Sequence, residues 1–165
     1  MTKSDILTKS EIADWFLENS KTGDVTPKKM QKLMYYAYAW GLVFFNDSVD
    51  NLQNKLFDGK FEAWVHGPVD RQIYAWFADF GYNPIPIPPE KPSIHIKNPD
   101  VLDLLQQIND IYGEFSGNQL ERLTHQEKPW LNARGDAKPL DPSENVISDK
   151  DMYIFYGSKL ESDVE

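Results

Sequence analysis

The stretch Lys32-Leu33-Met34-Tyr35-Tyr36-Ala37-Tyr38-Ala39-Trp40 decides the fold of this 165-residue chain. Shortly before it, Thr26 suits a helix N-cap, and Pro27 suits the first helical position, where a missing N–H costs nothing. One face of the predicted helix is entirely apolar, and it consists of Met30, Leu33, Met34, Ala37 and Trp40. The other side carries tyrosines in place of the charges of a surface helix. A helix that is apolar nearly all round lies at the centre of its fold, so the other elements should pack around it.

Further helices are predicted on both sides of this central one. Thr8-Lys9-Ser10-Glu11 fits a capping box, in which a hydroxyl and a glutamate satisfy free amides at a helix start. Gly67-Pro68 is the predicted start of a helix that ends at Gly81, a glycine suited to a helix C-terminus. The remaining helical signals are a cap at Asn98, the segment 118–125, a turn from Pro129 and a cap at Ser148.

One β-hairpin is predicted between the second and third helices. Asp58-Gly59 supplies the positive φ angles that a two-residue turn needs, and the second strand should run from Phe61 to Val65. A single hairpin is too small to be stable by itself and must lie on helices. We therefore predict a mainly α fold, a compact bundle of about six helices with one small β-hairpin, in a single domain over residues 1–165.

Residues 82–99 contain six prolines and should form an extended loop. Four isoleucines interrupt it and can dock on the body of the protein, namely Ile85, Ile87, Ile94 and Ile96. A rigid, exposed loop loses little entropy when it binds a partner, so it is one candidate binding segment.

Composition and charge limit the classes of function. The formal net charge of −9 argues against nucleic acid as the main partner, because phosphates require a basic surface. The acidic surface either attracts a basic partner or only keeps the domain soluble. The chain has no cysteine, no signal peptide and no apolar run long enough to span a bilayer. We expect a cytoplasmic protein that makes no membrane contact.

The search for catalytic motifs finds little. There is no phosphate-binding glycine loop and no nucleophile elbow. His66 and His125 could form a metal site with a carboxylate such as Asp70, but both also suit helix-end positions where an imidazole bonds free backbone groups. Glu62 is either an acid with a perturbed pKa or a solvated strand residue. We expect no cofactor and no enzymatic activity.

Three segments are distinctive in combination: Lys32 to Trp40, Phe61-Glu62-Ala63-Trp64-Val65-His66-Gly67-Pro68-Val69-Asp70, and Leu123-Thr124-His125-Gln126-Glu127-Lys128-Pro129-Trp130. Their order and spacing resemble the Panacea-domain antitoxins, the SocA-like family of bacterial and prophage toxin–antitoxin loci. The resemblance covers residues 9 to 134 and leaves 135–165 as a C-terminal extension with a terminal helix.

The resemblance implies a helical antitoxin that neutralises a cognate toxin by binding it. Some members carry an additional N-terminal DNA-binding segment. Here the domain begins almost at the first residue, so we do not expect direct DNA contact. One member also delivers its toxin to a protease as an adaptor, and these residues leave that role open.

The aromatic residues and Arg71 are assigned either to a partner-binding surface or to the core. Tyr35, Tyr36, Tyr38 and Arg71 lie off the main apolar stripes, and these residue types dominate binding hot spots, so we predict them as partner-binding residues. Trp40, Trp64 and Trp130 are predicted to be core. Two other functions stay open: a small metal-dependent hydrolase that uses His66 and His125, and a phage-encoded regulator that binds a host protein.

Overall fold

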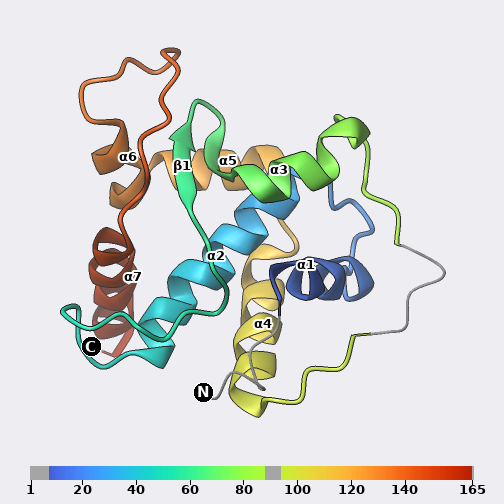
Figure 1. Cartoon of the computed structure of the whole chain (residues 1–165), viewed down its shortest axis with the longest axis horizontal. Coiled ribbons are helices and arrows are strands. Elements are labelled where there is room, and N and C mark those ends of the chain that lie inside the picture. The colour runs from blue at the N-terminus through green and yellow to red at the C-terminus, as the bar shows by residue number, and fades with distance from the viewer. Residues whose placement is uncertain (1–7, 88–93, 165) are drawn as a thin grey trace.

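The computed structural model describes residues 8–87 and 94–164, and its elements confirm a mainly α fold with one small hairpin (Figure 1). The helices are α1 (Lys9–Glu18), α2 (Pro27–Phe45), α3 (Arg71–Phe77), α4 (Pro99–Tyr112), α5 (Gly117–His125), α6 (Lys128–Arg134) and α7 (Asp149–Val164), with a 3-10 turn at Ala78–Phe80. The strands β1 (Phe61–Trp64) and β2 (Gly67–Asp70) form an antiparallel pair. No helix in the described ranges is long and apolar enough to cross a membrane.

Side-chain caps start α1, α2 and α4 where the sequence predicts them. Thr8 and Glu11 form the complete capping box of α1. The Thr26 hydroxyl accepts from the N–H of Lys29 and starts α2. The Asn98 side chain accepts from two amides at the start of α4. These bonds satisfy N–H groups that have no partner inside a helix, so the short-range signals place the helix starts correctly.

The central helix is α2, as its all-round apolar character predicts. It contacts α1, α4, α5, α7 and β2, and Figure 1 shows it crossing the middle of the molecule. Four members of its apolar stripe, Met30, Leu33, Met34 and Ala37, are at most 1% exposed, and the fifth, Trp40, is partly buried. The surrounding helices therefore pack their apolar faces against α2.

The hairpin lies later in the chain than its predicted position. Phe61 pairs with Asp70, and the turn falls at Val65 and His66 instead of Asp58-Gly59. Gly67-Pro68 belongs to β2, so the predicted helix start at this dipeptide was wrong. Helix α3 starts at Arg71, because the Asp70 carboxylate accepts hydrogen bonds from the N–H groups of Gln72 and Ile73.

The outer edge of β1 is covered by residues 145–147, which follow the loop after α6. The N–H of Ala63 donates to the carbonyl of Asn145 at 2.8 Å, and the N–H of Ile147 donates to the carbonyl of Phe61 at 2.8 Å. We call residues 135–147 the C-terminal arm. This arm places a segment from outside the predicted family region beside the hairpin.

The proline-rich loop docks in part. Ile85 is buried, and its N–H donates to the carbonyl of Val25 at 2.8 Å. Ile94 and Ile96 pack against the core and are partly buried. Ile87 is 55% exposed, so its predicted docking was wrong. Residues 88–93 of the loop lie outside the described ranges.

Candidate partner-binding surface

The three tyrosines predicted to bind a partner lie in the core. Tyr35, Tyr36 and Tyr38 are at most 1% exposed, so their predicted surface position was wrong. Helix α7 and strand β1 cover this side of α2: the ring of Tyr35 lies 5.5 Å from that of Phe61 and 6.2 Å from that of Tyr156. These three positions off the main stripe are buried because α7 and β1 cover this side of α2 as well.

The hydroxyl groups of these tyrosines find polar partners inside the core. Tyr36 and Tyr156 each donate to Oε1 of Glu127 at 2.8 Å, and Tyr38 donates to Oδ1 of Asp149 at 2.8 Å. Burial raises the pKa of Glu127, although the tyrosine hydrogen bonds and Lys159 oppose this effect. The cluster joins α2, α6 and α7 and serves the packing of the fold.

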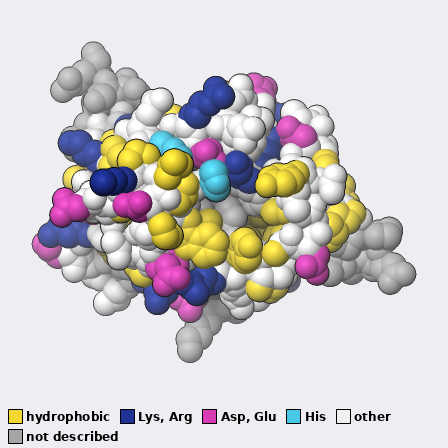
Figure 2. Space-filling view, turned by 90° about the horizontal axis from the view of Figure 1, so that it is seen from above, with side chains coloured by type: hydrophobic (Ala, Val, Ile, Leu, Met, Phe, Trp, Pro, Cys, Tyr) yellow, Lys and Arg dark blue, Asp and Glu magenta, His cyan; other side chains and the backbone are white. Residues whose placement is uncertain are grey.

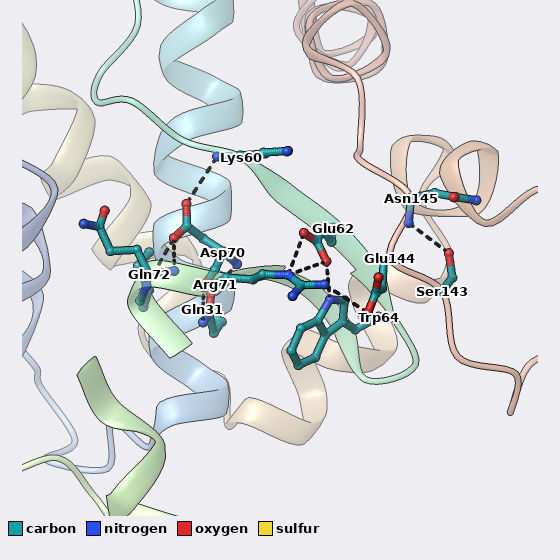
Figure 3. A network of polar contacts seen from close by, with 11 residues as sticks. Gln31, Lys60, Glu62, Trp64, Asp70, Arg71, Gln72, Ser143, Glu144 and Asn145 are labelled. Carbon is teal, nitrogen blue, oxygen red and sulfur yellow. Dashed lines mark hydrogen bonds and ion pairs between the residues drawn. The ribbon is translucent and has the colours of Figure 1, made fainter. Parts of the chain in front are cut away.

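Arg71, the fourth predicted binding residue, is exposed. Its side chain is 57% exposed, and its Nε donates to both carboxylate oxygens of Glu62, at 3.1 and 2.9 Å (Figure 3). A second nitrogen of its guanidinium pairs with Glu144 at 3.0 Å. The guanidinium is therefore held in one position at the surface.

Glu62 is the buried anchor of Arg71. Its side chain is 8% exposed, so the reading of a solvated strand residue was wrong. Burial raises the pKa of Glu62, but hydrogen bonds from Arg71 and from the indole of Trp64 outweigh burial and hold the pKa below its usual value. An ionised carboxylate at this point fixes both neighbours.

Aromatic side chains extend the surface next to Arg71. The rings of Trp64 and Tyr74 lie 5.3 Å apart, the Arg71 guanidinium lies 5.9 Å from the Trp64 ring, and Tyr74 is 50% exposed. We name Trp64, His66, Arg71, Tyr74 and Glu144 the hairpin face. Figure 2 shows this end of the molecule, where hydrophobic side chains gather beside histidines and between acidic and basic groups. Trp64 is only partly buried and departs from its predicted core position, whereas Trp40 is partly buried and packs against the core, and Trp130 is buried as predicted.

A groove runs along the hairpin face. It has a volume of about 290 Å³ and lies between the hairpin and the C-terminal arm, lined by Trp64, Val65, His66, Val69, Pro142, Ser143 and Glu144. This volume lies just below the roughly 300–1,000 Å³ typical of small-molecule sites. A groove of this size accommodates a large side chain better than a cofactor.

The residues of the metal-site alternative do not converge as that alternative requires. Asp70 caps α3 and pairs with Lys9 at 2.9 Å. His66 lies 3.1 Å from Glu121, and the His125 ring stacks on Trp130. Within the described ranges, no three histidine, aspartate or glutamate side chains are grouped as metal ligands.

A lysine lies directly behind the hairpin turn. Lys32 is 1% exposed, and burial lowers its pKa to about 7, although the nearby Glu121 carboxylate opposes this change. Burial also lowers the pKa of His125. Lys32 was not predicted as a site residue, although a lysine within an otherwise apolar and aromatic helical stretch is a usable signal.

Sequence reasoning also missed Tyr74 and Glu144 of the hairpin face. Tyr74 is on the exposed side of the short helix α3, next to the buried Ile73. Glu144 comes from the C-terminal arm, and its distance from Arg71 in sequence gives no signal of their contact. A signal for the contact between Glu62 and Trp64 was present in the sequence, because side chains two residues apart on a strand lie on the same face.

Comparison with known proteins identifies the family of the chain. The family model described as antitoxin SocA-like, Panacea domain, matches residues 30–131, more than half of the chain. The chain therefore belongs to the SocA-like Panacea-domain antitoxin family. No curated protein and no solved structure matches it.

Proposed function

We propose that this chain is the antitoxin of a type II toxin–antitoxin system and that it neutralises its cognate toxin by direct binding in the cytoplasm. The role is non-enzymatic, and binding occludes the active or substrate site of the toxin. Membership of the antitoxin family supports a toxin partner in general. The hairpin face is the proposed contact surface.

One observation carries the choice of surface: an exposed arginine is fixed by a buried carboxylate beside two aromatic rings. Arginine, tryptophan and tyrosine are the residue types most enriched in binding hot spots. Glu62 holds Arg71 in place before binding, so less side-chain freedom is lost when a partner arrives. The adjoining groove adds apolar surface that a partner side chain can cover.

The test is rescue of bacteria that express the product of the neighbouring open reading frame. We expect Arg71→Ala and Tyr74→Ala each to weaken binding by about 2 kcal/mol or more, roughly 30-fold in Kd, and to reduce rescue. Ile111→Ala is the control, because Ile111 is 58% exposed on α4 and lies outside both the hairpin face and the proline-rich loop. Full rescue by the Arg71→Ala/Tyr74→Ala double variant would place the binding surface elsewhere.

The two other functions considered from the sequence have separate tests. Stoichiometric metal in protein purified without an affinity tag would favour the hydrolase with His66 and His125. Capture of a host protein in place of a toxin would favour the regulator. Neither function has a specific observation in its favour, whereas the antitoxin proposal has the family match.

A further inference from the structure

The groove of the hairpin face has apolar walls and a charged end. Trp64, Val65 and Val69 form the wall on the hairpin side, and Pro142 belongs to the opposite wall on the C-terminal arm. Glu144 lies at the charged end and is 78% exposed. The groove therefore offers an apolar volume next to an accessible carboxylate.

The charges within the ion-paired cluster around Arg71 do not cancel one another. Arg71 contacts two carboxylates, Glu62 and Glu144, so the three side chains carry a net charge of −1 (Figure 3). The Arg71 charge is already neutralised by buried Glu62, from which it lies 2.9 Å away. The charge of Glu144 is the surplus, in a chain whose net charge is −9.

We propose that the groove binds a large apolar side chain of the toxin whose neighbouring residue is an arginine or a lysine, and that this cation pairs with Glu144. This inference rests on the proposed antitoxin function. The apolar side chain covers Trp64 and Val69, while the cation balances the surplus negative charge. Charge complementarity thus selects a basic segment over an acidic one.

The ion pair between Glu144 and Arg71 is weak enough for Glu144 to exchange it for a pair with a cation of the toxin. Arg71 and Glu144 are both largely exposed, and exposed ion pairs contribute little net stability. Arg71 keeps its contact with Glu62 when Glu144 turns toward a partner. A partner that presented a carboxylate would instead compete with two acidic side chains for one arginine.

The inference can be tested with short peptides of defined chemistry. The probes are the acetylated amides of leucyl-arginine and leucyl-glutamate, titrated into the full chain and followed by the indole N–H signal of Trp64 in NMR spectra. We expect leucyl-arginine to shift this signal and to bind at least five-fold more tightly than leucyl-glutamate. Glu144→Gln should reduce this preference to less than two-fold, and Ser143→Trp, which fills the groove, should abolish the shift.

Asp103→Asn is the control for Glu144→Gln, because it removes one exposed carboxylate from α4, at the end of the molecule away from the hairpin (Figure 1). It should keep the five-fold preference. An unshifted Trp64 signal, or equal binding of both peptides, would overturn the inference. If the Arg71 and Tyr74 variants lose rescue while the peptides bind equally, this inference fails and the antitoxin proposal stands. Rescue that survives those variants counts against the proposed surface itself.

Discussion

Gly67 lies directly against the side chain of Lys32: a Cβ atom added at Gly67 would be 2.6 Å from Cε and 3.1 Å from Nζ of the lysine. The same Cβ would lie 3.1 Å from Oγ1 of Thr124. Each of these three residues belongs to a different one of the three distinctive sequence segments. The segments therefore meet at one point behind the hairpin turn, which gives their joint occurrence a physical reason.

Gly67→Ala should destabilise the protein more than an alanine at another glycine with positive φ. Gly67 has a φ of 109° and the close contact with Lys32, so both backbone strain and overlap oppose a side chain. We expect a loss of roughly 2–3 kcal/mol in the free energy of unfolding, measured with urea.

Gly135→Ala is the matched control, because Gly135 has a φ of 56° but no atom within 4 Å of the added Cβ. Backbone strain alone should cost it about 1–2 kcal/mol, because its ψ of −119° lies outside the left-handed α region. Equal losses at the two positions would show that the contact between Gly67 and Lys32 has no energetic consequence.

Buried Lys32 should make stability increase with pH above neutrality. Its pKa is about 7 in the folded protein against an ordinary value of 10.5. Between these values the unfolded chain binds the proton and the folded chain does not, so raising the pH favours folding. The slope should be at most about 1.4 kcal/mol per pH unit.

Urea unfolding of the native chain and of Lys32→Met at pH values from about 7 to about 10 measures this dependence. The variant should lose the rise. Above about pH 10 the sign reverses, because burial raises the pKa values of Tyr35, Tyr36 and Tyr38 and the unfolded chain loses those protons first. The same rise in both proteins would assign it to another group.

Tyr35→Ala should cost roughly 3–5 kcal/mol of folding stability, because it removes a buried ring from the centre of the core. Tyr82→Ala, at a 96% exposed ring, should change the melting temperature little. Thermal melting followed by circular dichroism compares the two. A Tyr35→Ala protein with normal stability but impaired rescue would return this tyrosine to the binding surface.

Local signals predicted the helices well because caps act over three or four residues. Thr8, Thr26 and Asn98 each bond to amides a few positions along the chain. The register of the hairpin was missed because a tertiary contact determines it. Gly59 resembles a turn glycine, but it is needed where the backbone passes the rings of Phe57 and Tyr38.

The candidate site was predicted only at Arg71 for a similar reason. Burial of Tyr35 and Tyr36 depends in part on α7, whose Tyr156 lies more than 100 positions further along the chain. Helical periodicity identifies a face but not the number of neighbours that cover the helix. Pairing of Arg71 with Glu144 likewise requires the path of the C-terminal arm.

Association with a basic toxin should slow when salt is added. The chain carries a net charge of −9, and raising the ionic strength from about 0.1 to about 1 M shortens the screening length from about 10 to about 3 Å. Long-range attraction then weakens, whereas short-range contacts change less, so the association rate should fall more than the dissociation rate rises. Stopped-flow mixing of the two purified proteins measures both rates.

At low salt, Glu144→Gln should slow association more than Asp103→Asn, since both remove one exposed carboxylate but only Glu144 lies on the hairpin face. Association rates that do not depend on salt would exclude electrostatic steering and leave the apolar contacts of the hairpin face to account for binding.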